Sequence, residues 1–125
     1  MATTILLVDD SKTSRTVNFA YLYSLLGDEA ICLEASGGAE AMALLATHPV
    51  DLVLLDLTMP GMSGFDVLVE MQRLAMQAQV VVISADIQRR TRARVAELGA
   101  VGFLAKPWRI EALEAVLNSL GVSHA

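Results

Sequence analysis

The sequence contains little that would place this protein outside a reducing compartment or on a nucleic acid. It has one cysteine, Cys32, so no disulfide can form within the chain, and this favours the cytoplasm. Nine basic residues stand against 14 acidic ones, and the net charge of -5 disfavours binding to nucleic acid, which needs a basic face. No apolar run approaches the ~20 residues of a membrane span, and the first residues lack the basic region of a secretory signal. We therefore expect a cytoplasmic protein that binds neither nucleic acid nor membrane.

The length of 125 residues suits a single domain. A chain of this size can bury roughly two thirds of the surface that it exposes when unfolded. We expect residues 1–125 to form one domain, with its core between about residues 4 and 121 and with no output domain.

Short apolar runs alternate along the chain with segments of helical periodicity. The runs cover residues 5–8, 30–35, 52–55, 80–83 and 101–104, and the helical segments cover residues 11–26, 39–47, 65–76, 86–98 and 109–120. Runs that are apolar throughout are typical of strands buried on both faces. Their alternation with helices predicts a parallel sheet with right-handed crossovers and helices on both sides. The predicted fold class is therefore α/β.

Four of the five predicted strands are followed by polar side chains that suit phosphate or metal chemistry. Asp9 and Asp10 follow the first strand, Asp56 the third, Ser84 the fourth and Lys106 the fifth. The carboxyl ends of parallel strands share one edge of the sheet, where open α/β sheets bind ligands. We therefore expect these residues to converge in space.

Three carboxylates at one place predict a bound cation. At an effective dielectric of ~20, two unit charges ~4 Å apart repel by about 4 kcal/mol. Oxygen ligands of this kind suit Mg²⁺. Lys106 and Ser84 offer a positive charge and a hydroxyl to a phosphoryl group in transfer. Carboxylates are nucleophiles toward phosphoryl groups, and Asp56, on the central strand, is the best candidate for that role.

Each of these residues also has an ordinary structural interpretation. Asp9 and Asp10 alone would be helix-capping residues, and only their combination with the other strand ends favours chemistry. Asp51 and Asp66 are interpreted as surface or capping residues. A Mg²⁺-dependent phosphatase of the haloacid-dehalogenase type also uses a strand-end aspartate, but it expects a second aspartate two residues later. That position is Thr58, so this alternative is less favoured.

Four segments together resemble a response-regulator receiver domain. They are ILLVDDS at residues 5–11, LLDLTMPGMSG at 54–64, VVISA at 81–85 and GFLAKPW at 102–108. Each segment is moderately specific, and all four in this order are highly specific. The resemblance implies a flavodoxin-like three-layer αβα sandwich with five parallel strands in the order 2-1-3-4-5 and five helices.

The resemblance also implies a function in two-component signalling. Asp56 would accept a phosphoryl group from a sensor histidine kinase or a histidine phosphotransfer protein. Asp9, Asp10, Asp56 and the backbone carbonyl of Thr58 would bind Mg²⁺ or Mn²⁺. The protein would be a signalling module that catalyses only its own phosphorylation and dephosphorylation, and it would either switch the binding of a downstream partner or pass the phosphoryl group on in a phosphorelay.

The same resemblance assigns switching roles near the site. Ser84 matches the hydroxyl that moves toward the phosphate, and Lys106, followed by Pro107, matches the phosphate-contacting lysine. Phe103 occupies the place of the aromatic switch residue. A tyrosine is common there in chemotaxis-type members, so a contact through its hydroxyl is lost.

Two helices carry side chains that the core does not explain. The helix at residues 11–26 has Val17, Tyr21 and Leu25 on one stripe and Phe19, Tyr23 and Leu26 near another. Both stripes cannot face the sheet, and we expect Phe19 and Tyr23 to contact the phosphodonor. The alternative is an exposed aromatic pair without a partner.

The fourth helix contains four of the nine basic residues, namely Arg89, Arg90, Arg92 and Arg94. A solvated helix face is the ordinary interpretation. The alternative is a contact with an unknown acidic output protein, or self-association, through the surface formed by the fourth and fifth helices.

Overall fold

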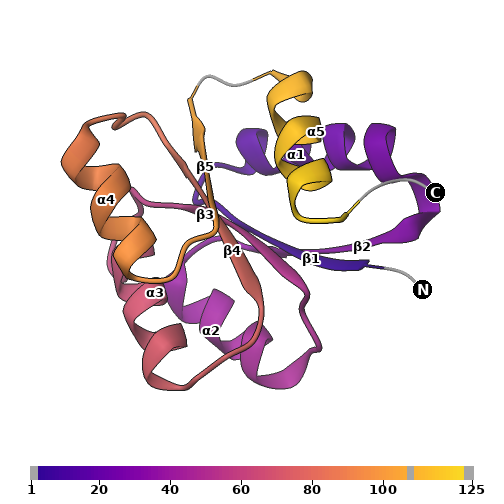
Figure 1. The fold of residues 1–125 in the computed structure, drawn as a ribbon. Coiled ribbons are helices and arrows are strands. Elements are labelled where there is room, and N and C mark those ends of the chain that lie inside the picture. Colours follow the sequence, from indigo (N-terminus) through magenta and orange to yellow (C-terminus); the bar gives the residue numbers. More distant parts are fainter. Residues whose placement is uncertain (1–2, 107–108, 123–125) are drawn as a thin grey trace.

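Five parallel strands form one sheet in the order β2-β1-β3-β4-β5, which confirms the order implied by the sequence (Figure 1). The computed structural model describes residues 3–106 and 109–122, so the prediction on Pro107 lies outside the described residues. The strands are β1 (Thr3–Val8), β2 (Ala30–Ala35), β3 (Leu52–Asp56), β4 (Gln79–Ser84) and β5 (Gly102–Ala105).

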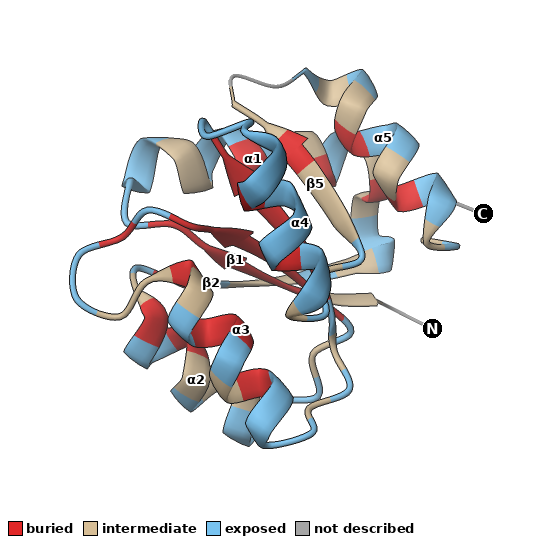
Figure 2. Cartoon of the chain, turned by 60° about the vertical axis from the view of Figure 1, so that its left-hand side comes forward, coloured by how far each residue is buried: buried red, intermediate tan, exposed pale blue. Residues whose placement is uncertain are grey.

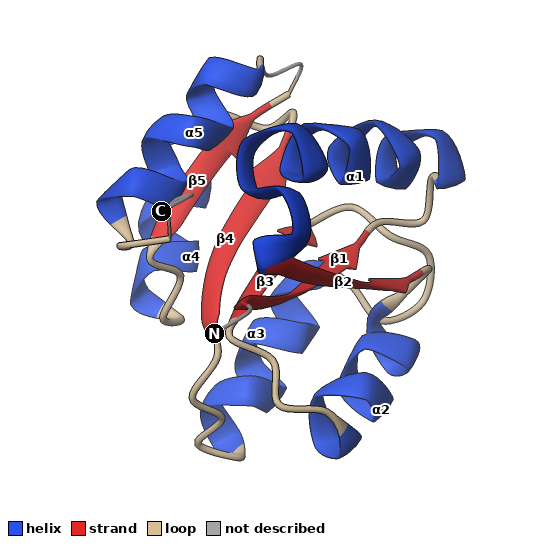
Figure 3. Ribbon diagram, turned by 90° about the vertical axis from the view of Figure 1, so that its right-hand side faces the viewer, coloured by secondary structure: helices blue, strands red, loops and turns tan. Residues whose placement is uncertain are grey.

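The helices cover both faces of this sheet, as predicted. They are α1 (Lys12–Leu26), α2 (Gly38–Thr47), α3 (Gly64–Arg73), α4 (Arg89–Glu97) and α5 (Ile110–Ser119), and a short 3₁₀ helix, Gly27–Glu29, follows α1. Figures 1 and 3 show α1 and α5 on one side of the sheet and α2, α3 and α4 on the other. No helix in the described ranges is both long enough and apolar enough to cross a lipid bilayer.

The core is divided into two layers by the alternation of side chains along the strands. Ile5 and Leu7 of β1 pack with α1 and α5, whereas Leu6 and Val8 pack with α2, α3 and α4. All five residues of β3 are buried, and the buried segments in Figure 2 run through the centre of the sheet. A strand that is covered on both faces needs no polar alternation, which explains its continuous apolar run.

The ends of two predicted helices are wrong, and local hydrogen bonds explain both. Helix α3 ends at Arg73 rather than at residue 76, because Ala75 adopts a positive φ of 53° and the Met76 N–H donates to the carbonyl of Met71. Helix α4 begins at Arg89 rather than at residue 86. The carboxylate of Asp86 accepts from the Gln88 N–H and the Thr91 hydroxyl, so it precedes the helix as a capping group.

Helix α1 begins after Ser11, whose hydroxyl accepts a hydrogen bond from the Ser14 N–H. The residues that it buries are Asn18, Leu22 and Leu26. The prediction that Leu26 lies near the same stripe as Phe19 and Tyr23 was therefore wrong. Phe19 and Tyr23 lie on the outer surface, with 44% and 61% of their area exposed.

Candidate functional site

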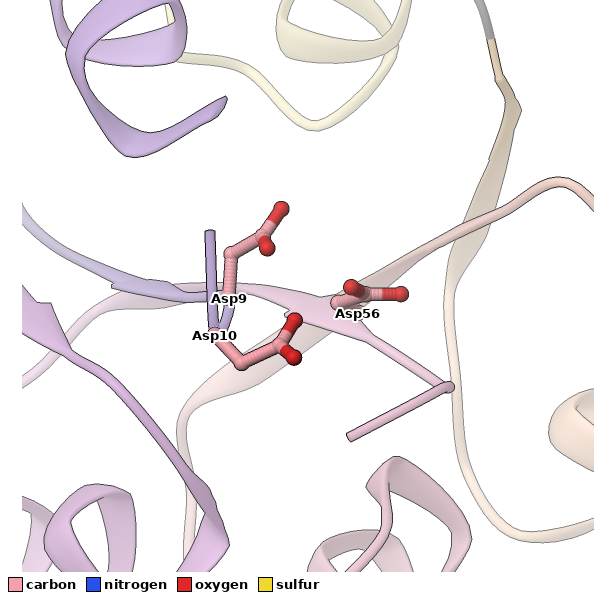
Figure 4. A group of neighbouring side chains, drawn as sticks. All are labelled: Asp9, Asp10 and Asp56. Carbon is pink, nitrogen blue, oxygen red and sulfur yellow. The ribbon is translucent and has the colours of Figure 1, made fainter. Parts of the chain in front are cut away.

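The carboxylates of Asp9, Asp10 and Asp56 meet at the carboxyl edge of the sheet. One ligand oxygen from each lies within 4.8 Å of the others, and Figure 4 shows the three side chains next to one another. The register explains this, because β1 pairs directly with β3, with Val8 opposite Leu55. Asp9 and Asp56 are buried, whereas Asp10 is exposed. The predicted convergence of these three residues is confirmed.

Lys106 completes the charged group from the end of β5. Its Nζ lies 3.2 Å from Oδ2 of Asp56 and 3.5 Å from Oδ2 of Asp9. Partial burial lowers the pKa of Lys106, but the carboxylates of Asp56 and Asp9 outweigh that effect, and the net pKa is raised. The ammonium therefore stays charged at neutral pH, and one cation faces three carboxylates.

The carboxyl group of Asp56 is only partly compensated by this cation. Burial raises its pKa, and the neighbouring Asp9 raises it further. The charge of Lys106 and the Thr58 N–H, which donates to Oδ1 at 3.2 Å, act in the opposite direction without cancelling the rise. Lys106 thus compensates the ionised form of Asp56 only in part, and a metal ion would supply further positive charge.

Asp9 is held by hydrogen bonds at each of its polar atoms. Its N–H donates to the Ala35 carbonyl at 3.1 Å, and its Oδ1 accepts from the Ser11 N–H at 2.9 Å. Its Oδ2 faces Lys106, and its backbone carbonyl accepts from Nη1 of Arg15 at 2.6 Å. The role of Arg15 was missed at the sequence level, because no local pattern relates a helix residue to the strand end that precedes it.

The loop after Asp56 folds back closely against the end of β3. A Cβ atom on Gly64 would lie 2.5 Å from the Asp56 carbonyl oxygen and 2.7 Å from Cα of Leu57. Only glycine therefore fits at this position. The loop is supported from the other side by α2, where a Cβ on Gly38 would lie 2.8 Å from the carbonyl oxygen of Met62.

Ser84 lies at the end of β4, on the neighbouring strand. It is 2% exposed, and its hydroxyl accepts a hydrogen bond from the Asp86 N–H at 3.0 Å. The Lys106 N–H donates to the Ser84 carbonyl at 2.8 Å, so these two residues are linked through the backbone. Residue 83 stands opposite Asp56 in the sheet, and Ser84 follows it. The structure therefore places Ser84 at the same edge as the acidic group.

Two arginines of α4 contact aromatic rings on neighbouring elements. The guanidinium carbon of Arg92 lies 4.9 Å from the centre of the Phe103 ring, and that of Arg94 lies 4.5 Å from the centre of the Phe65 ring. Such cation–π contacts stabilise by about 0.5–1 kcal/mol at exposed sites. The basic face of α4 is thus partly engaged with the protein itself, including the predicted switch residue.

The other acidic residues have the structural roles that the sequence predicted. Asp51 lies at the opposite edge of the sheet, where its Oδ2 accepts from the Thr4 N–H at 2.8 Å. Asp66 forms a capping box with Ser63 at the start of α3.

The acidic group fits a divalent cation by the chemistry of its donors. Three carboxylates offer the hard oxygen ligands that Mg²⁺ prefers. One ammonium cannot neutralise three carboxylates, and burial, the main cause of the raised pKa of Asp56, makes its ionised form still more costly without a bound cation.

Comparisons with known proteins agree with this geometry. The family of the response regulator receiver domain matches residues 5–118. The chain is 35% identical over 121 residues to the chemotaxis protein CheY of Bacillus subtilis (strain 168), which covers 96% of this chain and 99% of that protein. It is 30% identical over 114 residues to the probable C4-dicarboxylate response regulator DctR of the same organism, with 91% and 50% covered.

A solved structure gives the same fold. The response regulator protein TrrA from Thermotoga maritima, in complex with Mg²⁺ and BeF, has a TM-score of 0.81 and 25% identity, with 94% of this chain and 98% of that chain covered. The chain spans about half the length of several curated relatives and nearly all of CheY. The family match over most of the chain decides against the haloacid-dehalogenase alternative.

Proposed function

The chain belongs to the family of response regulator receiver domains, and on that premise we propose that Asp56 accepts a phosphoryl group and that this changes binding to a downstream partner. One observation carries the proposal. The buried carboxylate of Asp56 lies 3.2 Å from the ammonium of Lys106 and within 4.8 Å of ligand oxygens of Asp9 and Asp10. A phosphoryl acceptor needs a nucleophile next to positive charge, and this site has both.

The roles of the side chains follow from their positions. A carboxylate oxygen of Asp56 attacks the phosphorus atom of the donor's phosphohistidine, the bond between phosphorus and the imidazole nitrogen breaks, and the imidazole leaves with that electron pair. Lys106 balances the charge of the phosphoryl oxygens, and the Ser84 hydroxyl moves toward them once its bond with the Asp86 N–H is given up. Phe103 follows this movement and changes its contact with Arg92.

A divalent cation, Mg²⁺ or Mn²⁺, would be held by Asp9, Asp10, Asp56 and the backbone carbonyl of Thr58. It would supply positive charge to the phosphoryl oxygens during transfer. The relative TrrA, whose structure is described as a complex with Mg²⁺ and BeF, supports this part of the proposal.

The phosphodonor is a sensor histidine kinase or a histidine phosphotransfer protein that docks on α1. Phe19 and Tyr23 are one turn apart on α1, and both rings are exposed. A pocket of about 450 Å³ lies between this helix and the site, lined by residues that include Val17, Asn18 and Lys106. It gives a partner side chain room next to the lysine that contacts Asp56.

Replacing Phe19 and Tyr23 with alanine tests the docking surface. Transfer from the cognate kinase should slow about tenfold or more, since loss of a buried aromatic anchor costs roughly 2 kcal/mol at an interface. Phosphorylation by a small phosphodonor should not change. Equal slowing with both donors would show that the substitutions disturb the site rather than a docking surface.

The output surface is formed by α4, β5 and α5. Arg92, Phe103, Arg109 and Glu111 line a shallow pocket there, and the contact of Arg92 with the Phe103 ring links this surface to the site. Its partner is an acidic protein or a second copy of the chain. Charge reversal of Arg92 and Arg94 should weaken this binding, and unchanged binding would leave the arginines with an intramolecular role only.

The protein acts as a diffusible output module or as a phosphorelay intermediate, and we propose that it does so in the cytoplasm. Support for a reducing compartment comes from Cys32, which as the single cysteine of the chain cannot form an internal disulfide.

Incubation with Mg²⁺ and acetyl phosphate tests the central claim. Mass spectrometry should show the gain of one phosphoryl group, stable in acid and labile in base, on the peptide that contains Asp56. The variant Asp56→Asn should not gain it. Label on another residue, or rapid turnover of many donor molecules, would contradict the proposal.

A further inference from the structure

Arg15, in the first turns of α1, joins two elements that lie far apart in the sequence. Its Nη1 donates to the Asp9 carbonyl at 2.6 Å, and its Nε donates to Oε1 of Glu34 at 3.1 Å. Only 14% of its side-chain area is exposed, so the guanidinium is largely removed from water. Glu34 belongs to β2, which pairs with β1 and places it opposite Leu7. The arginine thus connects the edge strand to the first acidic residue of the site.

Asp9 and Asp10 differ sharply in how the protein holds them. The N–H, the carbonyl and both carboxylate oxygens of Asp9 each have a partner, and Asp9 is 3% exposed. The Asp10 carboxylate is exposed and accepts no hydrogen bond from the described part of the chain. One carboxylate is therefore fixed before a ligand arrives, while the other is free to adjust.

We propose that Arg15 and Glu34 form a clamp that positions Asp9 for metal binding, which makes Arg15 a positioning residue for the phosphoryl-transfer site. The inference rests on the proposed function, because it presumes that the acidic group binds a divalent cation. Arg15 donates to the carbonyl of Asp9 through Nη1 and to the carboxylate of Glu34 through Nε. These two bonds fix the conformation of the turn between β1 and α1. Removal of a group that hydrogen-bonds a metal ligand and orients it typically lowers metal affinity by 10–100-fold.

The charge of Arg15 and the clamp predict opposite effects of Arg15→Met on Mg²⁺ affinity. The guanidinium of Arg15 donates to the backbone carbonyl of Asp9, and its positive charge would repel a divalent cation bound by the Asp9 carboxylate. If charge were its only effect, Arg15→Met would therefore tighten Mg²⁺ binding, most strongly at low salt. The clamp predicts the opposite sign, because the variant releases the Asp9 carbonyl and the turn that carries both acidic residues.

Calorimetric titration of the purified protein with MgCl₂ shows whether Arg15→Met binds Mg²⁺ more tightly or more weakly than the wild type. We expect Arg15→Met to weaken Mg²⁺ binding roughly tenfold. Arg15→Lys should restore part of the loss, because an ammonium can replace one of the two hydrogen bonds. Glu34→Gln should weaken binding less, and it should add little to Arg15→Met in the double variant. Unchanged or tighter binding in Arg15→Met would overturn the clamp.

Arg73 provides a matched control. It pairs with Glu70 on the surface of α3, with 65% of its side chain exposed, so Arg73→Met also deletes one ion-paired arginine. Its Mg²⁺ affinity should equal that of the wild type. The rate of phosphorylation by acetyl phosphate gives a second comparison. Arg15→Met should be phosphorylated more slowly than the wild type at low Mg²⁺, and this deficit in rate should shrink when Mg²⁺ is raised to saturation. A deficit that persists at saturation would contradict a positioning role in metal binding.

Hydrogen exchange of the metal-free protein tests the clamp without any metal. In Arg15→Met the amide of Ser11 should exchange faster, because its acceptor, Oδ1 of Asp9, belongs to the released turn. The amide of Asp9 should also exchange faster, because Asp9 itself is then held less firmly against its acceptor, the Ala35 carbonyl of β2. The amide of Leu54 in the central strand should be unaffected, which shows that the variant is folded. Protected Asp9 and Ser11 amides would overturn the clamp. If the wild type binds no Mg²⁺, the metal assignment fails, and the exchange result still decides whether Arg15 holds the turn.

Discussion

The two edges of the sheet use aspartates in opposite ways. At the amino edge, Asp51 exchanges two hydrogen bonds with Thr4, since its N–H donates to the Thr4 carbonyl at 2.9 Å and its carboxylate accepts from the Thr4 N–H at 2.8 Å. At the carboxyl edge, Asp9, Asp10 and Asp56 face one ammonium. The first arrangement pairs the single carboxylate with a backbone donor of the protein. The second leaves an excess of negative charge, which is a cost in stability that functional sites typically carry.

Removing the ammonium from the carboxyl edge should have the largest effect. In Lys106→Met we expect phosphorylation by acetyl phosphate to slow about 100-fold, because the loss of one preorganised donor to a developing charge typically costs that much. The rate is measured by mass spectrometry at saturating Mg²⁺. Asp51→Asn, at the amino edge, should phosphorylate at the wild-type rate. A similar loss in both variants would mean that the two edges do not differ in function.

Removing the carboxylate from the amino edge should affect stability alone. Asp51→Ala loses the acceptor for the Thr4 N–H, and we expect the free energy of unfolding in urea to fall by about 1.5 kcal/mol, the low end for a bond to a charged group. Phosphorylation should remain normal. Unchanged stability together with slower phosphorylation would reverse the comparison between the edges.

Removing the charge of Asp56 should instead stabilise the metal-free protein. Burial and Asp9 raise the pKa of Asp56, so folding favours its protonated form. The ionised form is therefore destabilising at neutral pH, and we expect Asp56→Asn to raise the free energy of unfolding by about 1 kcal/mol.

The pH dependence checks the sign of this effect. The destabilisation by the ionised carboxylate is complete above the pKa that Asp56 has in the folded protein. It disappears as the pH falls toward the pKa that Asp56 has in the unfolded chain. The stability difference between the wild type and Asp56→Asn, measured by urea unfolding in a chelator, should therefore narrow on acidification. A difference that widens would show that the carboxylate is already compensated in the metal-free site.

The smallest effect is expected at the turn after α3, near the amino edge. Ala75 has a φ of 53°, which is costly for a residue with a Cβ. Ala75→Gly removes that cost but adds freedom to the unfolded chain, and we expect a net gain of about 0.5 kcal/mol. Thermal unfolding measures it, with no change in phosphorylation. A loss of stability would mean that packing of the Ala75 methyl group outweighs the backbone cost.

The strands and the convergence of the acidic residues could be predicted from the sequence, because they depend on local runs and on the geometry of parallel sheets, whereas the strand order came from the resemblance to receiver domains. Asp9 and Asp56 converge wherever β1 and β3 pair. The contacts of Arg15 with Glu34 and of Arg94 with Phe65 could not be predicted in this way. They depend on how helices sit on the sheet, which no local pattern records. The start of α4 was missed because the Asp86 side chain bonds ahead of the helix rather than within it.

Helix α4 is lightly anchored to the sheet. It buries only Thr91 and Val95, whereas α3 buries four residues, and Figure 2 shows α4 as largely exposed. It also contacts the rings of Phe103 and Phe65 through Arg92 and Arg94. An element held by so few contacts opens at a lower free energy than the core does. Since Arg92 contacts the Phe103 ring, substitution of Phe103 is expected to make local opening of α4 more frequent.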